Sequence, residues 1–371
     1  MNKMRRSWAD YRRIWKRYQE KCGFSARRSL PTLEKICHKQ AKVRAWGIIL
    51  IKKSLLWCLC LWFVLAAGEA NPSASFNEWL DEFKQEALDK GIRGRTLDKA
   101  FHQTKFMPNI IRFDTTQAEK KETFRQYIDK RLPPRIARAI RKQKKHAQHL
   151  KKISKVYGVA SPIIVALWGI ESNFGKDAGK YNVIHSLATL AFDGRRSQFF
   201  RSELLEALKI LDMDKMPHRT LTGSWAGALG HCQFMPSSYN RYAIDGDGKG
   251  FSNIWEASVD LFGSIANYLQ KEGWKGDEPW GMEVKLPENF DKNMANLSIG
   301  KSTEEWSALG VRQKDGSHFA YPQLKGSIVI PDGGDHIFLV YNNFRVILKW
   351  NRSVNFALSV CLLADEIGAA Q

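Results

Sequence analysis

Glu171 is the residue of this 371-residue chain whose type and setting best suit acid–base chemistry. It lies near the end of an apolar run that begins at Ser161 and Pro162 and is followed by Gly175. Ser161 is a predicted N-cap, Pro162 suits the first helical position, and Gly175 suits a C-terminal stop. We therefore expect a helix whose last turn carries one carboxylate, with no Lys or Arg in the helix to neutralise it.

The predicted helix gives Glu171 surroundings that favour its protonated form. Helical spacing places it on one face with Ile164, Leu167 and Trp168. Burial among apolar groups raises the pKa of a carboxyl, and the negative end of the helix dipole acts in the same direction. A carboxylic acid that stays protonated near neutral pH can act as a general acid. The alternative is a glutamate that simply reaches solvent at a helix end.

A second informative segment, residues 223–238, reads Gly-Ser-Trp-Ala-Gly-Ala-Leu-Gly-His-Cys-Gln-Phe-Met-Pro-Ser-Ser. Its spaced Gly and Ala residues allow the backbone to approach another helix or a ligand closely. Gln233 then places one amide donor and acceptor among small and apolar groups. This combination is typical of a segment that lines a binding site.

Together with Arg195 and Arg196 between them, the two segments resemble the lytic murein transglycosylase B family, which is glycoside hydrolase family 103. The pattern from Gly169 to Gly175, followed by the Gly-rich Gln-Phe-Met-Pro-Ser-Ser, carries the resemblance, which extends from about Phe76 to the C-terminus. It implies a mainly α fold within the α+β class. The expected architecture is a lysozyme-like helical core with a helical N-terminal domain and a small β-rich insertion.

The resemblance implies a peptidoglycan lytic transglycosylase. It would cleave the β-1,4 bond between N-acetylmuramic acid and N-acetylglucosamine and leave a 1,6-anhydro ring, because the sugar's C6 hydroxyl attacks instead of water. Ordinary glycosidases use two carboxylates, whereas here Glu171 alone would act first as acid and then as base. Asp193 is the nearest candidate for a second carboxylate, but we expect it to pair with Arg195 and Arg196. A muramidase-type hydrolase and a non-catalytic peptidoglycan-binding protein remain alternatives.

Seven further positions match substrate contacts of the resembled family. They are Ser224, Gln233, Arg195, Arg196, Tyr268, Asn351 and Phe356. The two arginines offer cationic donors for carboxylates of peptide stems or lactyl groups. Phe356 stands where the family has a tyrosine, so ring stacking is expected there without a hydroxyl contact. For Tyr268, core packing is the alternative interpretation.

Residues 245–256, Asp-Gly-Asp-Gly-Lys-Gly-Phe-Ser-Asn-Ile-Trp-Glu, follow the spacing of a calcium loop. The candidate ligands are Asp245, Asp247, the Phe251 carbonyl and Asp260, with Glu256 as the alternative closing acid; Asp260 is the one that the resemblance implies. Lys249, however, occupies the fifth position, where Asp or Asn is expected, and its ammonium supplies no ligand. We expect no required cofactor. The sequence leaves open either a structural calcium or Lys249 paired with these acids in its place.

The net charge of +20 is concentrated near the N-terminus. Residues 1–53 hold 16 Lys and Arg against three Asp and Glu, whereas residues 71–371 carry a net charge of +8. We therefore expect no nucleic-acid partner. Residues 54–70 resemble a secretory signal, with an apolar run after two lysines and a small-residue end. This predicts a periplasmic protein, with membrane association through an uncleaved signal as the alternative. The basic extension 1–53 is then a start-site artefact or a cytoplasmic leader.

Changes in pattern divide the rest of the chain. We expect a helical domain at 71–155, a catalytic core at 156–281, a β-rich domain at 282–350, and a final helix at 351–371 that returns to the core. Residues 344–350 form one of the β-like runs of the β-rich domain. The basic run between residues 120 and 155 predicts either a solvated helix face or a face toward an anionic polymer.

The remaining expectations concern cysteines and partners. Only Cys232 and Cys361 follow the predicted signal, and a domain of this size predicts two buried thiols. The expected state is a monomer acting on peptidoglycan glycan strands. Proteins of cell-wall synthesis or division are candidate partners.

Overall fold

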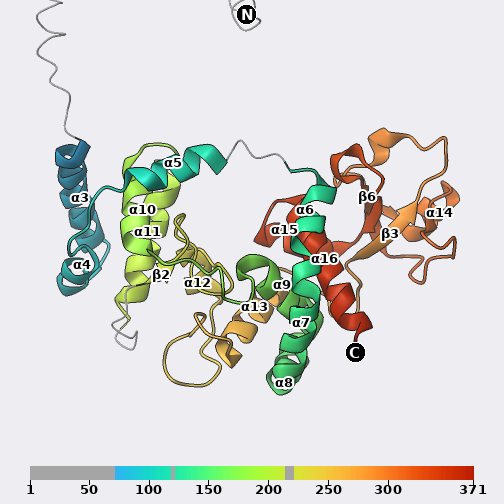
Figure 1. The fold of residues 1–371 in the computed structure, drawn as a ribbon, viewed down its shortest axis with the longest axis horizontal. Coiled ribbons are helices and arrows are strands. Elements are labelled where there is room, and N and C mark those ends of the chain that lie inside the picture. The colour runs from blue at the N-terminus through green and yellow to red at the C-terminus, as the bar shows by residue number, and fades with distance from the viewer. Residues whose placement is uncertain (1–71, 118–121, 214–220) are drawn as a thin grey trace, which may run out of the picture. The chain divides into compact units, whose positions relative to one another are not determined.

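The computed structural model describes residues 72–117, 122–213 and 221–371, which belong to one compact unit, Asn71–Gln371 (Figure 1). The predicted extension at 1–53 and the predicted signal at 54–70 lie outside the described residues. Helices dominate the described part, with one small sheet and one two-stranded ribbon. The prediction of a mainly helical fold with a small β-rich part is confirmed.

The chain enters through three helices that surround an aromatic cluster. They are α3 (Pro72–Asp89), α4 (Gly94–Ala100) and α5 (Pro108–Gln117). Spacings of three and four place Phe76, Trp79 and Phe83 on one face of α3. The Phe76 ring meets the Phe192 ring edge-on, with 5.3 Å between their centroids. This contact attaches the first helices to α10 (Val183–Phe192).

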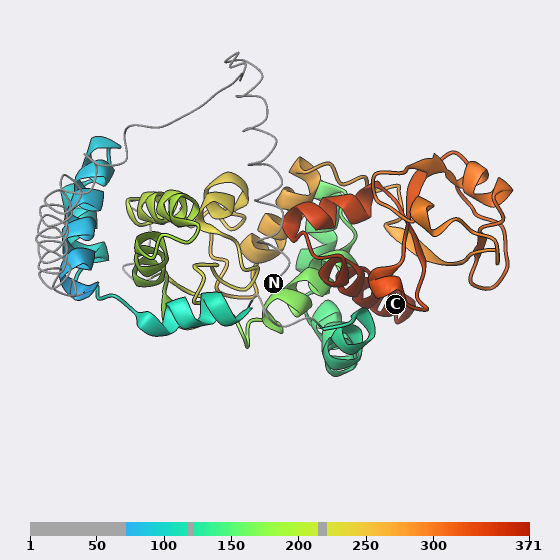
Figure 2. The ribbon, with the colours of Figure 1, turned by 90° about the horizontal axis from the view of Figure 1, so that it is seen from above.

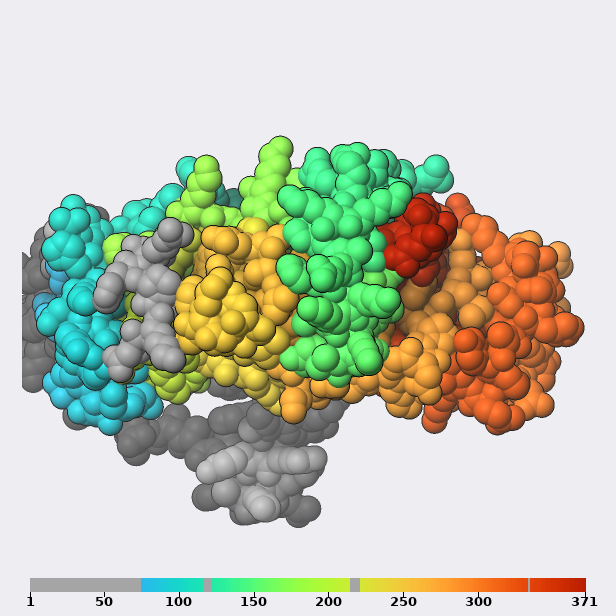
Figure 3. All heavy atoms as spheres, turned by 90° about the horizontal axis from the view of Figure 1, so that it is seen from below, coloured from blue at the N-terminus to red at the C-terminus, as the bar shows by residue number. Residues whose placement is uncertain are grey.

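The next four helices are joined by very short connections. They are α6 (Phe124–Arg131), α7 (Pro133–Lys145), α8 (Ala147–Tyr157) and α9 (Ser161–Ser172). Seen from below, α7 and α8 form a continuous green part of the molecular surface (Figure 3). Both present charged residues outward, whereas α9 is buried from residue 163 to residue 170.

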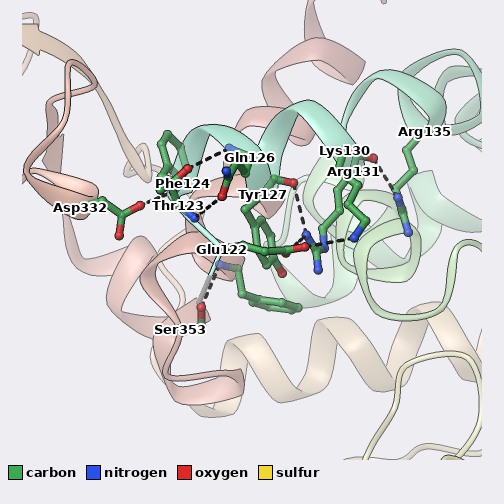
Figure 4. A network of polar contacts seen from close by, with 11 residues as sticks. Glu122, Thr123, Phe124, Gln126, Tyr127, Lys130, Arg131, Arg135, Asp332 and Ser353 are labelled. Atoms are coloured by element: carbon green, nitrogen blue, oxygen red, sulfur yellow. Dashed lines mark hydrogen bonds and ion pairs between the residues drawn. The ribbon is translucent and has the colours of Figure 1, made fainter. Parts of the chain in front are cut away.

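A polar network at the start of α6 ties this helix to the β-rich part of the chain (Figure 4). Thr123 and Gln126 form a reciprocal capping box that satisfies the first backbone donors of the helix. The Phe124 amide donates to the Asp332 carboxylate, and the Phe124 ring packs edge-on against Phe338 at 5.9 Å between centroids. Helix α6 therefore begins at a fixed point on the sheet.

Helix α9 lies in the middle of the core, packed by α7, α8, α13 (Val259–Lys271) and α16 (Val354–Ala369) (Figures 1 and 2). The core continues through the pair α10 and α11 (Ser197–Leu211) and through α12 (Pro236–Tyr242). Within the described residues, no helix is by itself long and apolar enough to span a membrane, although the bent pair α8 and α9 meets that test jointly.

The β-rich part is an antiparallel sheet with the order β4-β6-β7-β3-β5. Its strands are β3 (Gly281–Lys285), β4 (Lys301–Ser302), β5 (Arg312–Gln313), β6 (Lys325–Val329) and β7 (Phe338–Val340). A small separate core around Trp306 and Tyr341 supports it, together with α14 (Thr303–Ala308) and two short 3-10 turns, Lys292–Met294 and Pro331–Gly333. The two-stranded ribbon pairs β1 (Tyr181–Asn182) with β2 (Thr222–Gly223).

Three local predictions differ from the structure. Residues 344–350 were expected in a strand, but they belong to α15 (Asn342–Trp350), because Phe344, Val346 and Ile347 face inward at helical spacing. Helix α9 starts at Ser161, one residue earlier than expected, so its N-cap is Ala160 and not Ser161. The same helix stops before Gly175, with Asn173 as the left-handed C-cap. The prediction of two buried free thiols is confirmed.

Candidate active site

Glu171 lies in the last turn of α9, one residue before the helix ends. Residues 163–170 are all buried, so the acid is carried by a helix that is fixed in the core. The next residues beyond the helix, Asn173, Phe174 and Gly175, take positive φ angles of 52°, 61° and 86°. This left-handed turn ends the helix directly beyond the acid and directs the chain away from it.

The Glu171 carboxyl has one hydrogen-bond partner among the described residues, the indole of Trp350. Trp350 Nε1 donates to Glu171 Oε1 over 2.6 Å. Burial raises the pKa of Glu171 to about 8, and the indole donor opposes this shift because it stabilises the charged form. No charged side chain of the described segments contributes to the shift. Glu171 therefore holds its proton at neutral pH while keeping partial exposure to solvent.

Arg135 of α7 and Tyr127 of α6 lie near the same end of α9. Arg135 Nε donates to the Gly169 carbonyl over 2.9 Å. The Arg131 guanidinium lies 3.6 Å from the centroid of the Tyr127 ring (Figure 4). Burial raises the pKa of Tyr127, the charge of Arg131 lowers it, and the charge of Glu171 raises it. The phenol therefore lies within electrostatic reach of the acid.

Trp350 and Tyr127 are the residues near the acid that sequence reasoning missed. Trp350 lies 179 positions beyond Glu171, at the end of the helix that was expected to be a strand. Tyr127 lies in the basic run, where attention fell on the charges. Their one sequence signal is an aromatic ring with a polar tip, and core packing produces the same signal.

The Gly-rich segment 223–238 contacts the end of α9 and Trp350 of α15. Ser172 Oγ donates to the His231 carbonyl over 2.6 Å. The rings of Phe234 and Trp350 lie 5.1 Å apart, so the segment also supports the indole that binds the acid. The two segments singled out in the sequence are therefore adjacent in the structure.

Close backbone approach explains the glycines of this segment. A Cβ atom at Gly223 would lie 2.0 Å from the Ala228 carbonyl oxygen. Gly230 has a φ of 59°, and a Cβ there would lie 2.6 Å from the Ile254 carbonyl oxygen. Larger side chains at either position would force the backbone apart, which would displace the segment from α9.

Ser224 and Gln233 both hold the shape of this segment. Ser224 Oγ accepts the Ala228 amide hydrogen over 3.0 Å. Gln233 takes a positive φ of 51°, and its Nε2 donates to the carbonyls of Gly230 at 2.8 Å and Ala178 at 3.0 Å. Both side chains are half-buried. Their contact with substrate stays a prediction.

Tyr268 contacts Trp350 in space, and Asn351 follows Trp350 in the sequence. The Tyr268 ring is buried with its centroid 4.6 Å from that of Trp350. Asn351 is the exposed C-cap of α15, and its Oδ1 accepts the Ser353 amide hydrogen over 3.0 Å. Phe356 is buried in the first turn of α16, the helix that packs along α9. Core packing is thus the role of Tyr268 and Phe356 that the structure displays.

Arg195 and Arg196 have a different partner from the one expected. Both pair with Asp114 of α5, Arg195 through its Nε at 2.9 Å. Asp114 is buried, whereas both guanidinium groups are about half exposed. The predicted ion pair with Asp193 is wrong, because the loop between α10 and α11 turns both arginines toward α5. Burial raises the pKa of Asp193, and the charge of Asp114 adds to this shift. The charge of Arg195 acts in the opposite direction.

The carboxylates of the predicted calcium loop converge. One oxygen from each of Asp245, Asp247 and Asp260 lies within 4.8 Å of the others. Backbone amides already donate to both oxygens of Asp245, from Lys249 at 3.0 Å and from Gly250 at 2.6 Å. Lys249 Nζ lies 2.8 Å from Asp247 Oδ2. The loop therefore satisfies its acids from its own backbone and from one ammonium group.

Asp260, the closing acid that the resemblance implied, is the most buried of the three. Its Oδ1 accepts the amide hydrogens of Gly246 at 2.8 Å and Asp247 at 3.2 Å, and its Oδ2 accepts that of Asn253 at 2.8 Å. The ligand roles of Phe251 and Glu256 stay predictions, and the charge of Glu256 acts to raise the pKa of both Lys249 and His231. The residues present do not fit a calcium ion, because Lys249 brings a positive charge to the ligand atoms.

Residues 75–365 match the family described as the transglycosylase SLT domain. The chain belongs to this family. It is therefore a lytic transglycosylase, and the predictions of an enzyme and of this family are confirmed. The membrane-bound lytic murein transglycosylase B of Escherichia coli K12 is 30% identical over 310 residues, which cover 77% of this chain and 83% of that protein.

Solved structures of lytic transglycosylases share the fold. Pseudomonas aeruginosa SltB3, in complexes with NAG-NAM-pentapeptide and with NAG-anhNAM-pentapeptide, has a TM-score of 0.77 and 40% identity over 81% of this chain and 80% of its own. Escherichia coli Slt35 in complex with calcium has a TM-score of 0.68 and 26% identity over 82% of this chain and 95% of its own. The lysozyme-like core predicted for this lytic transglycosylase is confirmed by these neighbours.

Proposed function

We propose that this lytic transglycosylase cleaves the β-1,4 bond between N-acetylmuramic acid and N-acetylglucosamine in peptidoglycan, with Glu171 as its one acid and base. The observation that carries the proposal is the setting of Glu171. It is an isolated, half-buried carboxyl with a raised pKa, held by a single indole donor in the last turn of a buried helix.

The chemistry needs two proton transfers at one group. Protonated Glu171 gives its proton to the glycosidic oxygen as the bond from that oxygen to C1 of the muramic acid breaks. The resulting carboxylate then accepts the proton of the C6 hydroxyl as O6 bonds to C1. The carboxyl ends the cycle protonated, and no water is consumed. The indole N–H of Trp350 stabilises the carboxylate between the two transfers.

The absence of a second carboxylate supports intramolecular capture over hydrolysis. Among the described residues, no Asp or Glu contributes to the pKa shift of Glu171 or shares a hydrogen bond with it. A hydrolytic glycosidase positions a second carboxylate as nucleophile or to activate water. Asp193, the candidate from the sequence, belongs to the loop that carries Arg195 and Arg196. A muramidase that uses water is the second candidate, and the product distinguishes the two.

We further propose that the sugar chain contacts the segment around Ser224 and Gln233 and the exposed Asn351 beside Trp350. The support is proximity, since the Gly-rich segment and α15 both meet the end of α9. Arg195 and Arg196 share one carboxylate, Asp114, which leaves one positive charge for a substrate carboxylate. Tyr268 and Phe356 would then shape the site from behind the groups that touch substrate.

Replacing Glu171 with Gln tests the proposal. We expect Glu171→Gln to lower the release of soluble fragments from purified sacculi by about a thousandfold or more, because the amide cannot transfer the proton. Asp193→Asn is the matched control and should retain activity within about threefold. Equal cleavage by Glu171→Gln and the parent would overturn the mechanism and favour a non-catalytic binding protein.

We propose that Lys249 takes the place of a calcium ion in the loop 245–260. The support is the 2.8 Å contact of its ammonium with Asp247 and the backbone donors that already satisfy Asp245 and Asp260. Loop geometry would then not depend on a divalent cation, in contrast to the neighbour whose structure holds calcium. The catalytic steps need no metal in this proposal.

For location and partners, we propose a periplasmic monomer that acts on peptidoglycan glycan strands. The relatives are cell-wall enzymes, which favours the cell envelope, and the apolar run in 54–70 has the pattern of an export signal. Proteins of cell-wall synthesis or division remain candidate partners. Fractionation of cells that express the full chain tests the location.

A further inference from the structure

Part of the basic run forms a surface of exposed cations on α7 and α8. Residues 133–157 contain nine Lys and Arg and no Asp or Glu. Six of these cations are exposed: Arg141, Lys144, Lys145, Lys151, Lys152 and Lys155. None of the six has an ion-pair partner among the described residues. We call these six residues the basic track; the two helices that bear it face the viewer in Figure 3.

Helical spacing gathers these cations on particular sides of the two helices. Arg141, Lys144 and Lys145 lie at spacings of three and four near the end of α7. Lys151 and Lys155 lie four apart on α8, whose opposite face is buried through Ile153. The apolar side of α8 thus packs in the core, and its outward side carries the charged residues.

The cations of this region raise one another's electrostatic potential. The pKa of Lys142 is lowered, first by burial and then by the charges of Lys145 and Arg138. The pKa of His146 is lowered by burial and then by the charges of Lys142, Lys145 and His149. Like charges this close destabilise the folded state when no anion offsets them. Their arrangement is understandable if an anionic partner binds there.

The basic track is connected to the acid through α7 itself. Near the start of α7, Arg135 donates to the Gly169 carbonyl and Arg138 donates to the Asn173 side chain. Each of these acceptor residues is two positions from Glu171 in the sequence. Farther along, Lys142 Nζ lies 5.0 Å from the centroid of the Trp168 ring, and Gln143 Nε2 donates to Ser161 Oγ over 2.6 Å. Helix α7 therefore follows α9 along its length, and positive charge extends from the acid toward α8.

We propose that the basic track binds the carboxylates of the peptide stems on the peptidoglycan strand whose glycan occupies the Glu171 site. The partner is anionic peptide on the substrate polymer, and the inference rests on the proposed function. A pentapeptide ends in a carboxylate, and α7, which carries half of the track, runs along α9 from the end that holds Glu171. Arg195 and Arg196, the arginines first expected to bind stem carboxylates, share Asp114 and leave one positive charge between them, whereas all six cations of the track lack an ion-pair partner among the described residues. An anionic membrane is the competing partner and is tested alongside.

Binding measured in the Glu171→Gln background separates this inference from catalysis. Lys144→Glu with Lys151→Glu reverses two exposed cations of the track. The control, Lys285→Glu with Lys292→Glu, makes the same change of charge on exposed lysines of the β-rich part. Thermal unfolding of both variants verifies that they fold. Binding is then measured by co-sedimentation with intact sacculi, with glycan strands stripped of peptide, and with vesicles that contain anionic phospholipid.

We expect the track variant to bind intact sacculi about tenfold more weakly at low salt, and the control to change less than twofold. The difference between the variants should shrink as salt increases and should vanish on peptide-free strands. Equal binding of both variants to intact sacculi would overturn the inference. So would a deficit that persists on peptide-free strands, or one confined to vesicles, which would assign the track to a membrane. If Glu171→Gln still cleaved sacculi, the proposed mechanism would fail while these binding results kept their meaning.

Discussion

Glu171 and Asp260 are carboxyl groups near helix ends, and the protein places them in opposite surroundings. Asp260 lies in the first turn of α13, is buried, and accepts three backbone amide hydrogens. Glu171 lies in the last turn of α9 and accepts one indole hydrogen. Helix dipoles favour negative charge at the first position and disfavour it at the second.

The difference separates a structural carboxylate from a reactive one. A carboxylate with several fixed donors gains little from giving up or taking a proton, so it serves to hold a loop. A carboxyl with one donor in an apolar setting can exchange its proton at modest cost. The same contrast explains why Lys249 is tolerable in the loop, whereas no cation contributes to the shift of Glu171 among the described residues.

The largest expected effect on stability is at Asp260. Asp260→Ala leaves three buried amide groups without an acceptor, so we expect the free energy of unfolding to fall by about 3 kcal/mol. Asp247→Ala, at an exposed side chain, should cost less than about 1 kcal/mol. Urea unfolding of the two variants measures both values. Similar costs would break the contrast between Asp260 and its neighbours in the loop.

Lys249→Asp should convert the loop into a calcium site, because it restores a ligand and removes the ammonium group. We expect calcium at a hundredfold excess over its Kd to stabilise this variant by about 2.7 kcal/mol. The parent, and Lys271→Asp as a control at an exposed lysine of α13, should not respond. Thermal unfolding with calcium or with chelator measures the difference. A parent protein that chelator destabilises would show that Lys249 does not replace the ion.

The stability of the parent should depend on the protonation of Glu171. Its folded pKa is raised from 4.5 to about 8, so its stabilising effect is complete below pH 4.5 and is lost as pH rises through 8. Glu171→Gln lacks this dependence. We expect the parent to lose about 2 kcal/mol relative to this variant between pH 5 and pH 9, with allowance for the partial exposure of the group. Parallel stability curves of the two proteins would contradict the raised pKa.

Trp350→Phe is the smallest change that sharpens the contrast. It keeps the ring against Tyr268 and removes the N–H donor to Glu171. Because that donor stabilises the charged carboxylate, its loss should raise the pKa of Glu171, and the fall of activity at alkaline pH should move upward by about half a pH unit. Tyr268→Phe, which leaves the donor in place, should not move it. The pH dependence of kcat/KM for both variants checks this.

The sequence predicted the acid of the site better than the residues that surround it. The Glu171 helix and the Gly-rich segment each carry a local signal, an apolar run with one acid and a spaced set of glycines. Trp350 was not predicted as a site residue, because its contact with Glu171 spans 179 positions and depends on α15 being a helix. The run 344–350 is rich in residues that favour strands, and its burial on one helical face decided the outcome.

Ion pairing was the other point at which sequence reasoning was limited. Proximity in sequence suggested Asp193 as the partner of Arg195 and Arg196, whereas the buried Asp114, about eighty positions earlier, binds both. At Lys249 the local pattern was sufficient, because every partner of its side chain lies within the same loop. Local contacts can be inferred from spacing, and contacts between distant helices need the fold.

The mass of the product tests the central claim most directly. Purified sacculi are digested with the parent protein, and the muramic acid ends of the released fragments are analysed by mass spectrometry. One acid acting with the C6 hydroxyl predicts ends that are lighter by one water than the corresponding reducing ends, and no incorporation of oxygen-18 from labelled water. Reducing ends that carry the label would show hydrolysis and would contradict the account of Glu171 as a lone acid and base.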